Sequence, residues 1–222
     1  MIRAVLFDMD GTVFDTEKLY CACLAQVSRG TPLEQEMSEV LLAISGRNRA
    51  DIYAYLQDRY GADFPAEEIF TARDRLVMQS IREEGISFKP GFPEVFQTLK
   101  AQGLLVAIVT STHRARMEEY LHMTGLTDAF DYIKTGESVE HSKPAPDIFL
   151  QAAEALGCQP DECVVVEDSR NGVLSGLSAE MRVVMIPDMQ PCTSDLRERL
   201  WYCLSTVESL PSKIKEENQK IR

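Results

Sequence analysis

Four short runs of consecutive apolar residues constrain the fold of this chain more than any other feature. They lie at Ala4–Phe7, Leu104–Val109, Val164–Val166 and Val183–Ile186, and a fifth short strand is expected near Tyr132–Lys134. Unbroken apolarity over so few residues is typical of strands that are buried on both faces of a parallel sheet. The runs therefore predict an α/β core built on such a sheet.

Helical patterns separate these runs. Residues Pro93–Gln102, Ala115–Thr124 and Pro146–Leu156 have helical periodicity, and Gly125 and Gly157 follow the second and the third. Glycine is the common residue just after the last turn of a helix. The alternation of strands and helices predicts a doubly wound, Rossmann-like parallel sheet.

The segment from Thr16 to Ser87 has helical periodicity and no convincing strand. Gly30-Thr31-Pro32, Gly46 and Gly61 divide it. The expected helices are Glu17–Ser28, Leu33–Ile44, Arg49–Tyr60 and Pro65–Glu84. A helical insert directly after the first strand predicts a helical-bundle cap domain of residues 16–87, over a core domain of residues 1–15 and 88–222. The last ten residues, rich in Lys, Glu and Gln, are expected to form a frayed or solvated helix.

The charge and the apolar pattern exclude several classes of function. The net charge is −12, which argues against nucleic acids and anionic membranes as partners. No run approaches the ~18 apolar residues of a membrane span, and the cysteines form no CxxC pair. The N-terminal residues lack the pattern of an export signal, so export is not expected. We expect a cytoplasmic monomer that acts on a small molecule, since a metal ion and a few cations can make one cleft attractive to an anion.

An acidic loop, Asp8-Met9-Asp10-Gly11-Thr12, follows the first apolar run. Ligands of open α/β sheets bind just beyond the carboxyl ends of the strands, so this loop lies where chemistry is expected. A calcium loop is excluded, because no further oxygen ligands and no Glu follow at the required spacing. The loop alone leaves a plain turn and a functional site as alternatives.

Two further segments bear on the choice. The second strand ends in Thr110-Ser111-Thr112, whose hydroxyls and N–H groups at a strand-to-helix turn favour phosphate binding, although simple N-capping uses the same residue types. Lys143 lies in Ser142-Lys143-Pro144-Ala145-Pro146. It supplies a cation on a loop that two prolines stiffen, although a single lysine is more often a solvated surface residue.

Two adjacent acids, Glu167 and Asp168, end the third apolar run. Two like charges about 4 Å apart repel by roughly 4 kcal/mol at an effective dielectric constant of 20. If Asp8 converges on this pair, a divalent cation is the simplest way to relieve the repulsion. Oxygen ligands select a hard ion, and Mg²⁺ is the leading candidate.

Together these segments resemble the four motifs of the haloacid dehalogenase-like hydrolases. The matching residues are Asp8-x-Asp10-Gly11-Thr12, Thr110-Ser111, Lys143-Pro144 and Glu167-Asp168. The helical insert after the first motif and the Ser-Lys-Pro-x-Pro-x-Ile-Phe run are similar to the β-phosphoglucomutase-like subgroup. The resemblance covers the chain from Ile2 to about Leu210.

The resemblance implies a role for each matching position. Asp8 is expected to attack phosphorus and form an aspartyl phosphate, with Asp10 as general acid and base. The phosphoryl oxygens are expected to bind to Thr110, the backbone of Ser111, and Lys143. One Mg²⁺ per chain is expected on the side chains of Asp8, Glu167 and Asp168 and on the carbonyl of Asp10.

The cap is expected to set specificity through Thr16, Tyr20, Gly46 and Arg49. Gly46 lies in the loop that enters the active site in this subgroup. Arg49 aligns with an arginine that clamps a distal phosphate, although a helix-surface arginine is the plainer alternative. The second aspartate of the first motif argues against a dehalogenase, and the lone cap lysine, Lys18, argues against a phosphonatase.

Two departures bear on the reaction. Tyr20 stands where mutases of this subgroup have histidine, and His113-Arg114 stands where they usually have Lys-Asn. We therefore expect a phosphatase acting on a small phosphorylated metabolite. A β-phosphoglucomutase or related sugar-phosphate mutase is the alternative, and a non-catalytic binding module of the same fold is a third hypothesis, which the intact motif residues disfavour.

Overall fold

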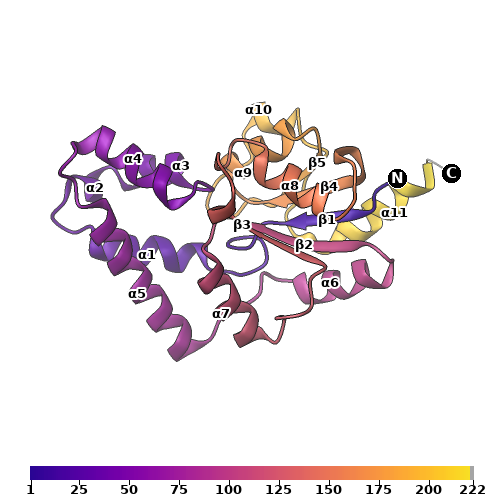
Figure 1. The fold of residues 1–222 in the computed structure, drawn as a ribbon, viewed down its shortest axis with the longest axis horizontal. Helices are drawn as coiled ribbons and strands as arrows, with labels where there is room; N and C mark the ends of the chain where they lie inside the picture. Colours follow the sequence, from indigo (N-terminus) through magenta and orange to yellow (C-terminus); the bar gives the residue numbers. More distant parts are fainter. Residues whose placement is uncertain (221–222) are drawn as a thin grey trace.

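A parallel sheet of six strands lies at the centre of the computed structural model, which describes residues 1–220 (Figure 1). The strand order is β3-β2-β1-β4-β5-β6. The bounds are β1 Ala4–Phe7, β2 Leu105–Thr110, β3 Tyr132–Thr135, β4 Cys163–Glu167, β5 Arg182–Met185 and β6 Tyr202–Cys203. Since the chain runs outward from β1 to β3 and then returns to β4, the strand order reverses between β1 and β4. Ligands of open α/β sheets bind at such a reversal.

Helices cover both faces of the sheet, because alternate residues of the buried strands point to opposite sides. Val5 and Phe7 belong to one apolar cluster, and Ala4 and Leu6 to the other. The first cluster includes side chains of α6 (Phe92–Ala101), α7 (Arg114–Thr124) and α11 (Leu210–Lys220), and the second includes those of α8 (Asp147–Ala155) and α9 (Arg170–Ser178). The result is the predicted doubly wound α/β core, with a short α10 (Ser194–Arg197) beyond β5.

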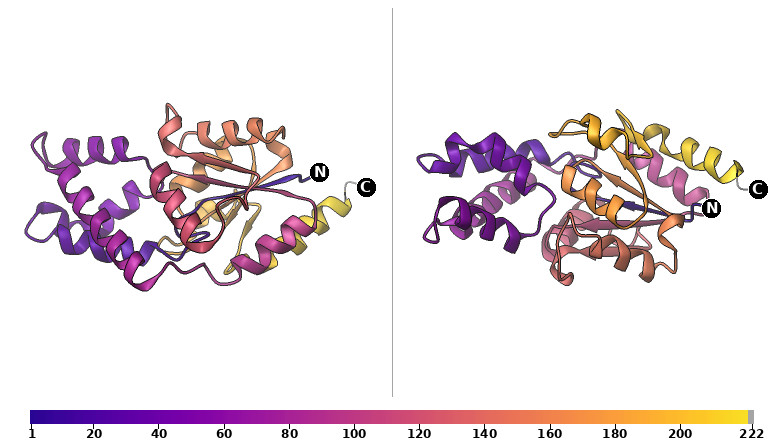
Figure 2. Two further views of the ribbon diagram at one scale, coloured as in Figure 1. Left: turned by 60° about the horizontal axis from the view of Figure 1, so that its bottom comes forward. Right: turned by 90° about the horizontal axis from the view of Figure 1, so that it is seen from above.

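Five helices follow β1 and gather at one end of the molecule, remote from the N-terminus (Figures 1 and 2). We call residues 16–87 the cap segment. Its helices are α1 Glu17–Val27, α2 Pro32–Gln35, α3 Met37–Ile44, α4 Arg49–Tyr60 and α5 Ala66–Glu84. They enclose a third apolar cluster, to which Leu24, Val40, Leu56 and Phe70 belong.

The two connections between the cap segment and the sheet run side by side. The Asp15 N–H donates to the Ser87 carbonyl at 2.9 Å, and the Lys89 N–H donates to the Val13 carbonyl at 2.9 Å. The rings of Phe14 and Phe88 stack with centroids 5.3 Å apart. The paired connections bring the cap segment over the carboxyl ends of the strands.

Two details differ from the sequence-based expectation. The helix expected over Leu33–Ile44 is divided at Glu36, whose carboxylate accepts hydrogen bonds from Arg59 Nε and the Tyr60 hydroxyl, each at 2.7 Å. Strand β6 was not expected, because two residues carry too little pattern to identify a strand.

The C-terminal segment is less solvated than expected. In α11, Ile214 is buried, and Asn218 bonds the backbone N–H and carbonyl of Ile2 at 2.6 and 3.0 Å. The last two residues of the predicted tail lie outside the described residues. Within residues 1–220, no helix is both long enough and apolar enough to cross a membrane.

Candidate active site

Three acidic side chains meet where the strand order reverses. Asp8 directly follows β1, Glu167 ends β4, and Asp168 comes next. One carboxylate oxygen from each lies within 4.8 Å of the others, and all three residues are at most 8% exposed. The predicted convergence of Asp8 on the Glu167-Asp168 pair is therefore present.

A glycine allows the first acidic loop to close on this group. Gly11 has φ +80°, and a Cβ atom there would lie 2.4 Å from Asp168 Oδ2. Any side chain at this position would therefore clash with Asp168 and strain the backbone. The Gly11 N–H donates to the Phe14 carbonyl at 2.8 Å, which closes the turn.

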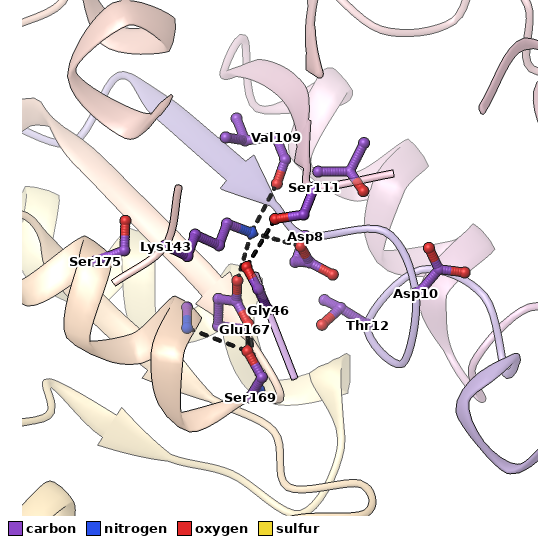
Figure 3. A network of polar contacts seen from close by, with 12 residues as sticks. Asp8, Asp10, Thr12, Gly46, Val109, Ser111, Lys143, Glu167, Ser169 and Ser175 are labelled. Carbon is purple, nitrogen blue, oxygen red and sulfur yellow. Dashed lines mark hydrogen bonds and ion pairs between the residues drawn. The ribbon is translucent and has the colours of Figure 1, made fainter. Parts of the chain in front are cut away.

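Lys143 lies between two of the acids and is fully buried (Figure 3). Its Nζ donates to Asp8 Oδ1 at 2.6 Å, to Glu167 Oε1 at 2.7 Å and to the Val109 carbonyl at 3.1 Å. Burial alone would lower the pKa of Lys143, but the charges of Asp8 and Glu167 outweigh burial and raise it. Lys143 is thus a permanent cation in the site, and not a solvated surface lysine.

Both oxygens of Glu167 already have donors. Oε1 accepts from Lys143, and Oε2 accepts from the N–H groups of Asp168 and Ser169, each at 3.2 Å, and from the Ser169 hydroxyl at 3.0 Å. Ser169 was not among the predicted site residues. Its hydroxyl also accepts from the Gly172 N–H at 3.1 Å, at the start of α9, so one residue ties the helix to Glu167.

Asp168 has no comparable cation. Lys143 pairs with Asp8 and Glu167, whereas among the residues that the structure describes no lysine or arginine pairs with Asp168. Burial raises its pKa well above the usual range, and the charges of Glu17, Glu167 and Asp8 add to the effect. Burial, opposed by Lys143 and reinforced by Glu167, likewise raises the pKa of Asp8. This buried, oxygen-only donor set is short of positive charge, so it fits a hard divalent cation such as Mg²⁺.

Asp10 is held by two hydroxyls. Thr16 Oγ1 donates to its Oδ1 at 2.6 Å, and Thr112 Oγ1 donates to its Oδ2 at 2.7 Å. Thr16 was a predicted site residue, whereas Thr112 was not. Thr112 is the last of the three consecutive hydroxyl residues, Thr110-Ser111-Thr112, at the end of β2. Asp10 is thus oriented by one residue of the cap segment and one of the core.

The turn after β2 touches the cap segment. Thr110 is buried, and its hydroxyl oxygen accepts from the Thr112 N–H at 3.0 Å. The Ser111 hydroxyl donates to the Gly46 carbonyl at 2.8 Å (Figure 3). A Cβ atom on Gly46, whose φ is +78°, would lie 2.9 Å from Ser169 Oγ. The cap loop therefore approaches the core as closely as its backbone permits.

A cavity of about 440 Å³ lies between the cap segment and the acidic group. Eight of the predicted site residues line it: Asp8, Asp10, Tyr20, Gly46, Arg49, Thr110, Ser111 and Asp168. The other three, Thr16, Lys143 and Glu167, lie behind this lining and contact it through the hydrogen bonds given above.

Two arginines of the cap segment, Arg49 and Arg73, and one of α7, Arg116, form another wall of the cavity. Asp74 pairs with Arg49, with Arg73 at 2.7 Å and with Arg116, from α7, at 2.5 Å. Burial opposes ionisation of Asp74, but the arginine charges, led by Arg73, outweigh it and lower its pKa to about 2. Arg49 thus lines the cavity, but its guanidinium is engaged with Asp74. Of these four residues, only Arg49 was predicted.

Tyr20 is packed into the same wall. Its hydroxyl shares a hydrogen bond of 2.8 Å with Tyr120 and accepts from Arg116 Nη1 at 3.1 Å. The Arg73 guanidinium carbon lies 4.9 Å from the centroid of the Tyr20 ring. Burial, and then the charge of Asp10, raises the pKa of Tyr20, so this side chain stays neutral at physiological pH.

Glu17 also lines the cavity, although no motif in the sequence singles it out. It is the first residue of α1 and lines the cavity beside Asp10. Burial, followed by the charges of Asp10 and Asp188, raises its pKa to about 7. Its position directly after Thr16 was the only available signal, and an acid in the first turn of a helix is common for reasons unrelated to function.

Comparisons with known proteins agree with this architecture. Residues 5–186 match the haloacid dehalogenase-like hydrolase family. The chain is 30% identical over 186 residues to hexitol phosphatase B of Escherichia coli strain K12, covering 84% of each chain. It is 28% identical over 208 residues to protein CbbY of Rhodobacter capsulatus, covering 90% of this chain and 92% of that protein.

A solved structure extends the comparison to the fold. β-Phosphoglucomutase of Clostridium difficile superposes with a TM-score of 0.79 over 100% of this chain and 99% of that one, at 20% identity. The six-stranded parallel sheet and the helices after its first strand are therefore shared. The chain belongs to the haloacid dehalogenase-like hydrolase family, in its β-phosphoglucomutase-like subgroup.

Proposed function

We propose that this chain is a Mg²⁺-dependent phosphatase that hydrolyses a small, sugar-phosphate-like metabolite through an aspartyl phosphate on Asp8. The observation that carries the proposal is the buried contact of 2.6 Å between Asp8 Oδ1 and Lys143 Nζ, beside Asp168 and under the cavity. Lys143 bonds only Oδ1 of Asp8 and so orients the carboxylate. The second oxygen, Oδ2, does not contact Lys143 and is the atom proposed to attack phosphorus. The phosphatase names of related proteins, such as hexitol phosphatase B, support the same class of reaction.

The first half-reaction transfers the phosphoryl group to the protein. Asp8 Oδ2 attacks phosphorus, the bond from phosphorus to the ester oxygen breaks, and Asp10 protonates the departing oxygen. The hydroxyls of Thr16 and Thr112 hold Asp10 in place for this proton transfer. The N–H of Ser111, the hydroxyl of Thr110 and Lys143 are suited to bind the phosphoryl oxygens.

The second half-reaction restores the protein. Asp10, now ionised, takes a proton from water, the water oxygen attacks phosphorus, and the bond to Asp8 breaks to release inorganic phosphate. Asp8 and Asp168, with Glu167 and the Asp10 carbonyl, would hold Mg²⁺. When bound, the ion neutralises charge on the transferring phosphoryl group. Both steps then depend mainly on positioning and charge.

Tyr20 favours hydrolysis over the mutase alternative. Its raised pKa and its bonds to Tyr120 and Arg116 leave it no capacity to exchange a proton near neutral pH. Asp10 is positioned by two hydroxyls instead, so it can activate water whether or not a second sugar is bound. An aspartyl phosphate in such a site is expected to hydrolyse before it meets another acceptor.

The proposed enzyme has two domains and acts in the cytoplasm. Residues 16–87 form the cap domain, and residues 1–15 and 88–222 form the core domain. The protein acts as a cytoplasmic monomer on a small phosphate ester, rather than on nucleic acid or a membrane, in keeping with its net charge of −12.

The test is phosphate release by the purified protein in MgCl₂ from p-nitrophenyl phosphate and a panel of hexose, hexitol and pentose phosphates. We expect release from the general substrate and faster release from some of the sugar phosphates. A folded protein that releases phosphate from none of them would contradict the proposal. A parallel incubation with β-glucose 1-phosphate and catalytic glucose 1,6-bisphosphate follows both products, and glucose 6-phosphate formed much faster than inorganic phosphate would establish the mutase.

A further inference from the structure

Two largely exposed apolar side chains line the cavity. Leu42, on α3, is 54% exposed, and Met189, in the loop after β5, is 46% exposed. Both line the cavity, although they belong to segments that are far apart in the chain. Single exposed apolar side chains are common on protein surfaces, whereas apolar side chains that gather around one cavity are typical of a ligand-binding surface.

Helix α1 shows how the lining of the cavity changes with distance from the acidic group. The helix begins beside the sheet with Glu17 and runs away from it into the cap segment (Figure 1). A Cβ atom on Gly11 would lie 2.4 Å from Asp168 Oδ2 and 2.9 Å from Glu17 Cγ, so Glu17 is next to the acidic group. Glu17, Cys21 and Leu24 all line the cavity from one face of the helix. At 1.5 Å per residue, Leu24 lies roughly 10 Å further along α1 than Glu17.

Two other segments lie near the outer part of α1. Leu41, beside Leu42 on α3, packs against the apolar cluster that contains Leu24. Burial raises the pKa of Cys21 to about 11, and the charges of Glu17 and Asp188 add to the effect, so the loop that carries Asp188 and Met189 lies close to α1. We call the following six cavity residues the apolar end: Cys21, Leu24, Leu41, Leu42, Met189 and Pro191.

The start of α9 fixes both of the segments that carry the exposed side chains. The Arg170 N–H donates to Oε1 of Gln190 at 2.8 Å, and Gln190 is buried in the middle of residues 189–191. Asn171 Nδ2 donates to the carbonyl of Ser45, directly after α3, at 2.7 Å. The apolar end is therefore carried by backbone that the core holds in place.

A hydrocarbon group fits this surface better than water or a sugar hydroxyl does. Placed between Leu42 and Met189, it would remove apolar surface of both side chains from water, which is favourable in proportion to the area covered. A wholly polar phosphate ester would satisfy the acidic group and would leave the apolar end exposed.

We propose that the apolar end binds a hydrocarbon part of the substrate, an alkyl or aromatic group carried by the alcohol whose phosphate ester is cleaved. This inference rests on the phosphatase activity proposed above. The substrate class narrows to sugar-like phosphate esters with an apolar substituent. The phosphate lies at the acidic group, the substituent extends along α1 toward Leu24, and Leu42 and Met189 determine the preference for it.

The test is competition against p-nitrophenyl phosphate hydrolysis in MgCl₂, followed by the absorbance of p-nitrophenolate. The competitors are ethyl, butyl and hexyl phosphate. Full burial of one CH₂ group improves binding about fourfold, so the inhibition constant of the wild type should fall at least about twentyfold from ethyl to hexyl phosphate. The double variant Leu42→Gln, Met189→Gln should raise the constant for hexyl phosphate at least fivefold and change that for ethyl phosphate less than twofold. Each single variant should give part of this increase.

The double variant Met123→Gln, Leu150→Gln is the matched control, because both residues are 39% exposed and neither lines the cavity. It should change none of the three constants. If the wild type gains nothing from chain length, or if both double variants leave hexyl phosphate unaffected, the inference is wrong. Equal weakening of ethyl and hexyl phosphate by the cavity variant would also contradict it, because Leu42 and Met189 would then support the phosphate site. A folded wild type that does not hydrolyse p-nitrophenyl phosphate would instead refute the proposed function.

Discussion

The floor of the cavity and its cap wall hold opposite surpluses of charge. On the floor, three carboxylates converge, and one cation, Lys143, pairs with two of them. On the wall, three arginines share one carboxylate, Asp74. Each group contains a single residue of the minority sign, Lys143 on the floor and Asp74 on the wall. The floor is therefore suited to a cation and the wall to an anion, and the two ends should respond in opposite ways when a charge is removed.

The largest effect is expected on the floor, from Asp8→Asn. The amide keeps the shape of the side chain but is not a nucleophile, so kcat should fall at least about a thousandfold. Steady-state phosphate release and far-UV circular dichroism test the loss of turnover with the fold intact. Asp128→Asn, in an exposed segment before β3, is the matched control. More than a few per cent of wild-type activity in the purified variant would remove Asp8 from the nucleophile role.

Removal of metal should have the next largest effect. Because no cation pairs with Asp168 in the described part of the chain, EDTA treatment should lower activity at least about a hundredfold, and added Mg²⁺ should restore it. Ca²⁺ should bind but inhibit, because it takes more oxygen ligands than Mg²⁺, at longer distances and in a less regular geometry. Full turnover after thorough chelation would show that the acidic floor needs no metal.

A pair of isosteric variants tests the opposite charges of the two ends through stability. The pKa of Asp168 is raised in the folded state, so ionisation destabilises the metal-free protein as pH rises through that value. Asp168→Asn should therefore stabilise the protein at pH 7 in EDTA. In Mg²⁺ the variant should no longer be more stable than the wild type, because the bound ion would neutralise the Asp168 carboxylate. The pKa of Asp74 is lowered to about 2, so it contributes stability above its unfolded pKa, near 4, which is lost as pH falls toward 2.

Asp74→Asn should accordingly destabilise the protein at pH 7 by about 2 kcal/mol, since one pKa unit corresponds to about 1.4 kcal/mol. Urea unfolding in EDTA at pH 7 measures both variants. A shift of the same sign for the two would mean that the floor and the wall do not carry opposite surpluses of charge.

The two ends also differ in how far the sequence predicts them. Floor residues end a strand or directly follow one, and parallel strands bring their carboxyl ends to one edge of the sheet. Asp8, Thr110 and Asp168 could therefore be placed together from the apolar runs. Lys143 was found through its proline-rich loop. The sequence pattern did not reveal that both carboxylate oxygens of Glu167 accept hydrogen bonds within the protein. Two of the donors are the backbone N–H groups of Asp168 and Ser169, and their directions depend on the conformation of the turn after β4.

The wall depends on long-range packing. Asp74 lies on α5, whereas its partners come from α4, α5 and α7. Helical periodicity gives the buried face of each helix but not the angle at which two helices meet, so it cannot show which arginines share an acid. The division of the expected Leu33–Ile44 helix has the same cause, because the partners of Glu36 are on another helix.

The smallest effect is expected from Tyr20→His, at the point where floor and wall meet. Tyr20 lies against Arg73 and Arg116 of the wall, and its pKa is affected by Asp10 of the floor. An imidazole there could bond Asp10 and draw its carboxylate from Thr16 and Thr112, which would slow the activation of water. Phosphate release should fall several-fold, and the aspartyl phosphate, trapped by acid quench with ³²P-labelled substrate, should accumulate.

Tyr20→Phe separates the contribution of the Tyr20 ring from that of its hydroxyl. The variant keeps the ring beside Arg73 and loses only the hydrogen bonds to Tyr120 and Arg116. It should release phosphate faster than Tyr20→His does, because Asp10 keeps both of its threonine donors. Mutase activity need not appear in either variant, since His113 and Arg114 also differ from the mutase pattern. If Phe slows release as much as His does, the Tyr20 hydroxyl itself supports hydrolysis. The absence of an imidazole would then not explain why water is the acceptor.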